Sequence, residues 1–372
     1  MNITRMRYGR GAALVLVAAP ITASAGPSQA QQAGPSRVHE GGPNQAQKAL
    51  RIVMVPKFTG TAYFAATEKG AKEAVAELKE KGVAIDFLYT GPSVANTDEE
   101  VSIIDDLVAQ KPDAIIIAAS DADKLVPVAK KAKDSGIKVI TYDGDVADPS
   151  ARQWFVNQGT FTEAGAALVD VVAEQAGAGA RLAVVSTSPG AFSQESWIAA
   201  MKAQMQAKYP RMQLVDMGYG QNKPTESFNA AQDLINRFRD QLDAIVVPSV
   251  VALPKVAEAV EQAGLTGKIV VTGMSTPNQI REFVKRGTVK TVVLWNPVDL
   301  GYLAVYAAQA SLAGTLGDNA TQAEVPAGRL GTRDAVVSLN DITAKGPLTL
   351  KNVIVLGDPF RFTKDNIDQF NF

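Results

Sequence analysis

The stretch Ala114-Ile115-Ile116-Ile117-Ala118 is apolar at every position and rich in β-branched side chains. Strands covered by helices on both faces have this composition, and they occur in parallel sheets. Residues 98–110 before the stretch and 124–135 after it carry apolar side chains at helical spacing. This helix–strand–helix order predicts a parallel α/β sheet with residues 114–118 near its centre.

The same alternation extends from this strand toward both ends of the chain. In the first half it predicts strands at 51–55, 84–89 and 137–142, and a helix at 67–81. In the second half it predicts strands at 182–186, 213–217, 244–247, 269–272 and 289–295, and helices near 160–176, 194–208, 225–240, 252–263 and 301–314. Because 372 residues exceed one ordinary core, we expect two doubly wound α/β lobes.

The N-terminal residues have the pattern of a secretory signal peptide. Arg5, Arg7 and Arg10 precede an apolar stretch at 12–19, and Ala23-Ser24-Ala25 is a small-residue cleavage site. The apolar stretch is shorter than the ~20 residues of a membrane-spanning helix. We therefore expect a signal peptide at 1–25, then a flexible linker rich in Gln, Gly and Pro at 26–47, and a periplasmic mature protein.

Composition excludes several classes of function. The chain has no cysteine, and its one histidine, His39, lies in the expected linker, so Ser-His-Asp and Cys-His catalysis and the usual zinc ligands are missing. The phosphate-binding glycine motifs are absent as well. Lys plus Arg (37) nearly balances Asp plus Glu (38), which speaks against nucleic acid as a partner. We expect no enzyme, cofactor or metal site, although chemistry based on carboxylates alone stays open.

Ligands of open parallel sheets bind outside the carboxyl ends of the strands. Lys57, Tyr63 and Phe64 follow the first predicted strand, Asp143 follows the fourth, and Trp295 ends the last. Charged groups and amides that accompany aromatic rings suit a polyhydroxylated ligand, because the rings cover its apolar C–H surface.

Several of these residues, and Trp197 on the helix predicted at 194–208, also have a simpler explanation. Tyr63 and Phe64 could be ordinary core at the start of a helix. Lys57 could be a solvated surface lysine, Asp143 could stabilise a turn with Gly144, and Trp197 could pack between helix and sheet. Asp121 and Asp145 could cap helices or solvate the mouth of a cleft, and they are not included in the predicted site.

The chain resembles the ribose-type sugar-binding proteins of ABC importers, in particular the branch with rhamnose-binding and autoinducer-2-binding proteins. The resemblance rests on Lys57, Tyr63-Phe64, Thr141-Tyr142-Asp143, 155–159, 273–278 and 287–290. The stretch from Thr291 to Tyr302, with 357–360 and 363–367, is most similar to the rhamnose binders.

The resemblance implies a type I periplasmic binding protein fold, in which a hinge joins two lobes. It implies an N-terminal lobe of 48–148 plus 299–318 and a C-terminal lobe of 152–295 plus 327–372. The chain would cross between them near 147–153, 295–299 and 317–327.

The resemblance also implies a ligand site on the facing walls of the two lobes. Its expected members are Lys57, Tyr63, Phe64, Asp143, Asn157, Ser193, Gln194, Trp197, Pro248, Val250 and Trp295. The chain departs from the autoinducer-2 binders, which have an Asp-Gln pair at Ser193-Gln194 and Pro-x-Ala at Pro248-Ser249-Val250. It departs from the ribose binders at Gly144, where they have an arginine.

The function that the resemblance implies is solute binding for an ABC sugar importer. The expected ligand is rhamnose or a similar deoxy-aldose, and the expected partner is a membrane permease. Autoinducer-2 or a pentose remains an alternative ligand, and a chemoreceptor an additional partner. A sugar-modifying enzyme and a sugar-responsive repressor are disfavoured, the latter because no DNA-reading motif precedes the first lobe. We expect a monomer.

Overall fold

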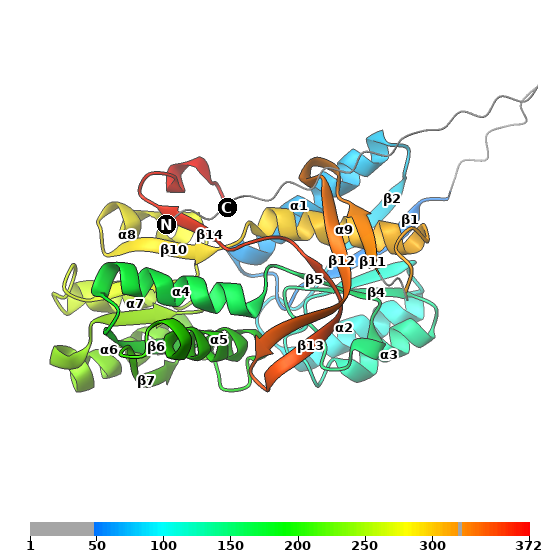
Figure 1. Cartoon of the computed structure of the whole chain (residues 1–372). Helices are drawn as coiled ribbons and strands as arrows, with labels where there is room; N and C mark the ends of the chain where they lie inside the picture. Colours follow the sequence, from blue (N-terminus) through cyan, green and yellow to red (C-terminus); the bar gives the residue numbers. More distant parts are fainter. Residues whose placement is uncertain (1–47, 319–321) are drawn as a thin grey trace, which may run out of the picture. The chain divides into compact units, whose positions relative to one another are not determined.

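The computed structural model describes residues 48–318 and 322–372 (Figure 1). The expected signal peptide and linker at 1–47 lie outside the described residues. None of the helices in the described part is long and apolar enough to cross a membrane.

The first sheet has eight strands in the order β11-β12-β13-β5-β4-β3-β1-β2; five of them come from residues 50–157 and three from residues 322–355. Its parallel strands are β1 (Leu50–Val55), β2 (Ile85–Tyr89), β3 (Ala114–Ile117), β4 (Lys138–Tyr142), β5 (Trp154–Asn157) and β13 (Gly346–Val355). The antiparallel strands β12 (Thr332–Thr343) and β11 (Gln322–Pro326) complete one edge.

Helices cover both faces of this sheet. Alternate side chains of the central strands pack on α2 (Thr97–Gln110) and α3 (Val126–Asp134) on one face. The other face packs on α1 (Ala62–Glu80) and α9 (Pro297–Leu312). Burial on both sides explains why residues 114–117 are apolar throughout.

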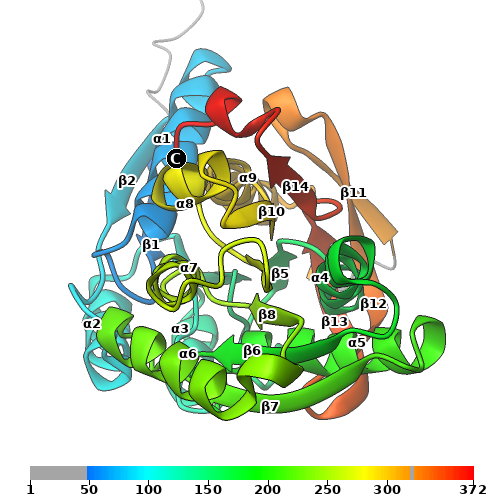
Figure 2. The same ribbon diagram turned by 90° about the vertical axis from the view of Figure 1, so that its left-hand side faces the viewer.

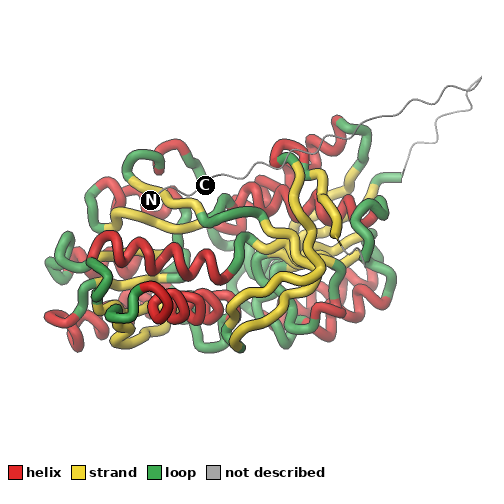
Figure 3. The backbone as a smooth tube through the Cα atoms, viewed as in Figure 1, coloured by secondary structure: helices red, strands yellow, loops and turns green. Residues whose placement is uncertain are grey.

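The second sheet has six strands in the order β14-β10-β9-β8-β6-β7 (Figure 2). Its parallel strands are β6 (Arg181–Ser186), β7 (Gln213–Tyr219), β8 (Ala244–Val247), β9 (Val270–Gly273) and β10 (Val289–Leu294), and β14 (Phe360–Thr363) is the antiparallel edge. Its helices are α4 (Phe161–Ala176), α5 (Phe192–Lys208), α6 (Pro224–Phe238), α7 (Leu253–Gln262) and α8 (Pro277–Lys285) (Figure 3).

The prediction of two doubly wound α/β lobes is confirmed. One difference matters for the site: α1 begins at Ala62 rather than at 67. The hydroxyl of Thr61 accepts a hydrogen bond from the backbone N–H of Phe64 and caps the helix. Tyr63 and Phe64 therefore belong to the first turn of α1.

Two segments that we expected in the second lobe pair with the first sheet. β5 pairs with β4, and β13 pairs with β5, because the apolar residues 154–156 are buried in the core of this sheet. The chain therefore leaves the first sheet after β5 rather than near 147–153. It returns between β10 and α9, within the expected 295–299, and it leaves again between β13 and β14 rather than at 317–327.

Two glycines bring α9 against α1. A Cβ atom at Gly70 would lie 1.7 Å from the carbonyl oxygen of Val298, and one at Gly301 would lie 2.0 Å from that of Thr67. Only glycine allows the backbones to approach this closely. The contact holds the segment that follows Trp295 against the helix that carries Tyr63.

The hairpin of β12 and β13 also reaches the helices of the second sheet. The carboxylate of Asp341 accepts hydrogen bonds from the backbone N–H groups of Phe161 (2.7 Å) and Thr162 (2.9 Å) at the start of α4. The backbone N–H of Ala344 donates to the hydroxyl of Ser196 on α5. A hairpin that is paired with the first sheet thus contacts both helices.

Candidate functional site

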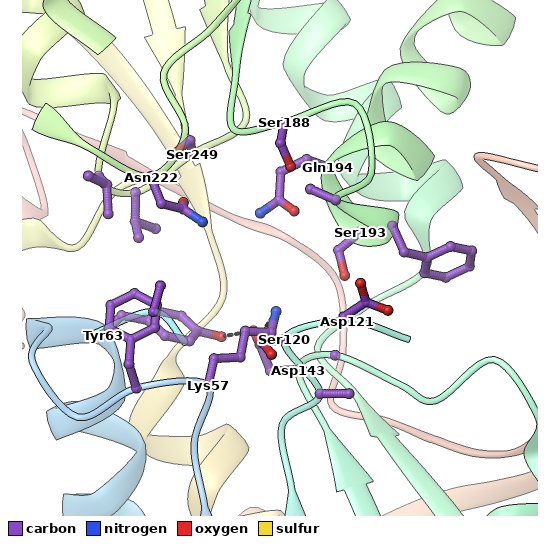
Figure 4. A pocket seen from close by; sticks show the side chains of 18 of the residues that line it. Lys57, Tyr63, Ser120, Asp121, Asp143, Ser188, Ser193, Gln194, Asn222 and Ser249 are labelled. Atoms are coloured by element: carbon purple, nitrogen blue, oxygen red, sulfur yellow. Dashed lines mark hydrogen bonds and ion pairs between the residues drawn. The ribbon is translucent and has the colours of Figure 1, made fainter. Parts of the chain in front are cut away.

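A pocket of about 340 Å³ lies at the carboxyl ends of the strands of both sheets (Figure 4). The loops that follow β1 to β4 line one side, and the loops that follow β6 to β10 line the other. Its lining residues fall within 57–64, 95–97, 119–122, 143–145, 188–197 and 248–251, with Asn222, Met274 and Trp295. This is the location that the strand-end rule predicts.

A chain of polar contacts joins four predicted site residues. Trp295 Nε1 donates to the hydroxyl of Tyr63 (2.8 Å), and that hydroxyl donates to Asp143 Oδ1 (2.6 Å). Lys57 Nζ forms an ion pair with Asp143 Oδ2 (2.8 Å). Burial and the nearby Asp143 charge raise the pKa of Tyr63 well above its ordinary value, so its hydroxyl remains a donor. These contacts hold the side chains in place before any ligand arrives.

The backbone at Asp143 is tightly constrained. Asp143 has a left-handed conformation, with φ of 59°, which is uncommon outside glycine. A Cβ atom at the next residue, Gly144, would lie 2.4 Å from the carbonyl oxygen of Ala119 and 2.8 Å from Lys57 Cε. Glycine at 144 therefore permits the turn that places Asp143 beside Lys57.

Asp145 lines the same pocket and is bound within the protein. Arg152, which is buried, donates from Nε to Oδ1 (2.7 Å) and from its terminal nitrogen to Oδ2 (2.5 Å). The hydroxyl of Thr141 also donates to Oδ1 (2.6 Å). Asp145 thus stabilises the loop after β4.

Aromatic rings supply apolar surface around the polar chain. Tyr63 packs edge-on against Phe64, with ring centroids 5.2 Å apart, and Phe58 packs edge-on against Phe64 at 5.6 Å. The rings of Trp197 and Trp295 also line the pocket, with their centroids 5.6 Å apart. Such rings accept the apolar faces and methyl groups of a small ligand.

The first turns of α5 contribute side chains to the pocket on the side of the second sheet. Trp197 follows Ser193 by four residues and Gln194 by three, so its side chain neighbours both on the surface of the helix. All three line the pocket. Pro248 and Val250 line it from the loop after β8.

The structure brings together all the predicted site residues except Asn157. Asn157 ends β5 and is fully buried. Its side-chain amide has no hydrogen-bond partner among the described residues, and it is not part of the pocket lining.

Several lining residues were outside the predicted set. Ser120 and Asp121 follow β3, Ser188 follows β6, and Asn222 follows β7. Their position after strands could have identified them, because the strand-end rule applies to each strand equally. Asn222 also has a left-handed backbone, with φ of 55°.

Glu100 lies beneath the loop after β3 and is fully buried. Its Oε2 accepts a hydrogen bond from the backbone N–H of Ser120 (3.2 Å), and its Oε1 has no partner among the described residues. Burial raises its pKa to about 8, so the carboxyl is mostly protonated at neutral pH.

The site combines donors, acceptors and apolar rings, and the described residues contain no cluster that could hold a metal ion. His39 lies outside the described part of the chain. The arrangement suits the binding of a small polar molecule that also has apolar surface.

Comparison with known families and proteins agrees with this geometry. Residues 52–316 match the family described as periplasmic binding protein domain. The chain is 29% identical over 248 residues to a D-ribose/D-allose-binding protein of Pseudomonas aeruginosa, covering 64% of this chain and 75% of that protein.

Solved structures share the fold. A sugar ABC transporter protein of Actinomyces odontolyticus is 32% identical, with a TM-score of 0.70, and the match covers 87% of this chain and 98% of that one. A solute-binding protein of Clostridium phytofermentas with bound L-rhamnose is 27% identical, with a TM-score of 0.75, and the match covers 86% and 98%.

Proposed function

This chain belongs to the periplasmic binding protein family, and from that premise we propose that it binds rhamnose or a similar deoxy-aldose for an ABC importer. It is a binding protein and not an enzyme, since the family and its structural relatives are substrate-binding proteins. The ligand occupies the pocket between the carboxyl ends of the two sets of strands.

One observation carries this proposal: the ordered Lys57–Asp143–Tyr63 contacts share a single small pocket with aromatic rings. Charged groups make strong, directed hydrogen bonds to sugar hydroxyls. The rings of Trp197 and Trp295 offer an apolar surface to the C–H face of the sugar and to the methyl group at its C5. A deoxy-aldose has both kinds of surface.

Departures from related sugar binders favour this ligand over two alternatives. At position 144 the ribose binders have an arginine, whereas this chain has a glycine and so lacks that side chain. Ser193 lacks the carboxylate of the autoinducer-2 binders, and Val250 is larger than their alanine. A pocket altered at these positions is a poor match for either ligand.

The relatives support the ligand class. The Clostridium phytofermentas protein was solved with L-rhamnose bound, and the Pseudomonas aeruginosa relative is named for D-ribose and D-allose. Both ligands of the latter are neutral aldoses.

Ligand binding closes the two lobes around the sugar. Residues 158–160, 295–296 and 356–359 connect the two sheets and serve as the hinge. A ligand that touches both walls stabilises the closed form by the contacts that it makes only there. The closed form presents both lobes to the permease, and it can also engage a chemoreceptor.

The decisive experiment is calorimetric titration of the purified mature chain with L-rhamnose, D-ribose, D-allose, D-arabinose and autoinducer-2. We expect saturable heat and the lowest Kd with L-rhamnose. Tighter binding of another sugar would correct the ligand and keep the class, whereas no heat with any of the five would contradict sugar binding. After the titration, chemical analysis of the sugar recovered from the sample tests for catalysis, and we expect the sugar to be unchanged.

Export precedes this function. We expect cleavage after Ala25 and release of the mature chain into the periplasm. N-terminal sequencing of protein from a periplasmic extract tests this, and an intact N-terminus on cytoplasmic protein would contradict it.

A further inference from the structure

Three carboxylates line the pocket, and their hydrogen-bond partners differ. Asp143 uses Oδ1 to accept from Tyr63 and Oδ2 to pair with Lys57. Asp145 uses both oxygens to bind Arg152. In these two carboxylates, therefore, each oxygen already has a partner within the protein.

Asp121 has an oxygen left over. Its Oδ1 accepts hydrogen bonds from the backbone N–H groups of Asp123 (3.1 Å) and Lys124 (2.9 Å). Its Oδ2 contacts no donor in the part of the chain that the structure describes. The side chain rises from the loop after β3 toward Ser193 on the opposite wall (Figure 4). A ligand between these walls meets the unpaired oxygen.

The negative charge of Asp121 has no cationic partner among the described residues that line the pocket. Lys57 is the one cationic side chain among the described lining residues, and it is paired with Asp143. Arg152 balances Asp145. Glu100 lies below and is mostly protonated at neutral pH, because burial raises its pKa. The net charge facing the ligand is that of Asp121.

We propose that Asp121 accepts hydrogen bonds from ligand hydroxyls through Oδ2 and makes the pocket select neutral sugars against sugar acids. This inference rests on the proposed function of sugar binding. A carboxylate accepts from two adjacent hydroxyls more strongly than a neutral group does. It also repels an anion in a partly desolvated pocket, and like charges are an effective means of rejecting wrong ligands.

The substitution Asp121→Asn isolates the unpaired oxygen. Asparagine keeps an oxygen for the N–H groups of Asp123 and Lys124, so the loop retains its turn, and it replaces the free acceptor by a neutral NH₂ group. Asp123→Asn is the matched control, because Asp123 is exposed on the same loop and does not line the pocket.

The first measurement is the Kd of L-rhamnose for the wild type and both variants, by calorimetry. We expect Asp121→Asn to raise the Kd by about 10- to 100-fold, as for loss of a hydrogen bond to a charged group, and Asp123→Asn to leave it unchanged. A Kd for Asp121→Asn within twofold of the wild type overturns the proposal.

The second measurement compares L-rhamnose with L-mannuronate, which carries a carboxylate in place of the methyl group on the same ring. We expect the wild type to bind the acid far more weakly. We expect Asp121→Asn to narrow the ratio of the two Kd values by about tenfold, because one like charge is gone. An unchanged ratio, or equal binding of both sugars by the wild type, overturns the selection against acids.

The two proposals fail in different ways. If the wild type binds no sugar of the panel, the proposed function fails and takes this inference with it. If the wild type binds a neutral sugar other than rhamnose, the same comparison is made with that sugar and its uronic acid, and the role of Asp121 stands or falls on that result.

Discussion

The indole Nε1 of Trp295 donates a hydrogen bond of 2.8 Å to the hydroxyl of Tyr63. Tyr63 belongs to the first turn of α1, on the first sheet, whereas Trp295 follows β10 of the second. Both side chains are buried, and their rings meet edge-on at 6.3 Å. The contact orients the Tyr63 hydroxyl, which donates a hydrogen bond to Asp143. Trp295 itself lies in the segment that connects the second sheet to α9.

Trp295→Phe removes this donor and keeps an aromatic ring. We expect the Kd of the sugar to rise by about two- to tenfold, the value of one hydrogen bond, because Tyr63 loses a fixed orientation. Calorimetric titration of the variant measures the change.

Trp154→Phe is the control for this substitution. Trp154 is fully buried in the first sheet, and its Nε1 has no partner among the described residues. The control should change thermal stability without changing the Kd. Equal Kd values for Trp295→Phe and the wild type would show that the Trp295–Tyr63 bond does not support binding.

Lys57 and Asp143 should behave as a coupled pair. Lys57→Met leaves Asp143 without its ion-pair partner, and we expect unfolding free energy to fall by about 1–3 kcal/mol, below the value for a fully buried pair, because the Lys57 side chain is 20% exposed. Combining it with Asp143→Asn should cost less than the sum of the two single changes. Urea denaturation measures all four proteins, and strict additivity would contradict the coupling.

Glu100 makes stability depend on pH. Its pKa is raised from 4.5 to about 8 by burial, so between these values the folded protein holds a proton that the unfolded chain has lost. The contribution of Glu100 to stability is therefore complete below pH 4.5 and is lost as pH rises toward 8, by at most about 1.4 kcal/mol per pH unit. Glu100→Gln, which stays neutral, should lose this slope and exceed the wild type in stability at pH 8.

The matched control for Glu100 is Glu99→Gln, an exposed change on the same helix. It should keep the wild-type slope in urea denaturation between pH 5 and 8. If the unfolding free energy of Glu100→Gln changes with pH between 5 and 8 as steeply as that of the wild type, Glu100 is not the source of the pH dependence and the prediction is wrong.

Asp341 links the β12–β13 hairpin to α4. It is buried and accepts from two backbone N–H groups of α4 and from the hydroxyl of Thr162 (2.6 Å). Asp341→Ala leaves these donors unpaired, and we expect a loss of about 1–3 kcal/mol of unfolding free energy. Asp334→Ala, on an exposed position of the same strand, should cost little. Similar denaturation midpoints for the two variants would contradict a capping role.

Local sequence patterns predicted much of the pocket lining. Lys57, Asp143 and Trp295 were identified because each follows a strand, and parallel strands direct their carboxyl ends to one edge. Asn157 also ends a strand, yet its side chain is buried and away from the pocket. A position after a strand therefore predicts that a residue lies at the edge where the pocket forms, but it does not predict whether the side chain points into the pocket.

The partners of the pocket carboxylates could not be predicted from sequence. Asp121 and Asp145 looked alike as acidic residues after strands. Arg152 neutralises Asp145 because β5 extends the first sheet and brings Arg152 back beside the β4 loop. No cation returns to Asp121 among the described residues, so it keeps an unpaired oxygen.

The amino-acid sequence by itself determined the two doubly wound sheets, the edge at which the pocket lies and the lack of histidine and cysteine chemistry in the described chain. These features follow from side-chain periodicity and composition, which are local. Only the tertiary structure decided that β5 and the β12–β13 hairpin belong to the first sheet, that Trp295 bonds to Tyr63, and which carboxylate is free. These depend on contacts between residues as many as 232 positions apart, and strand pairing at such separation follows from packing of the whole core rather than from any local pattern.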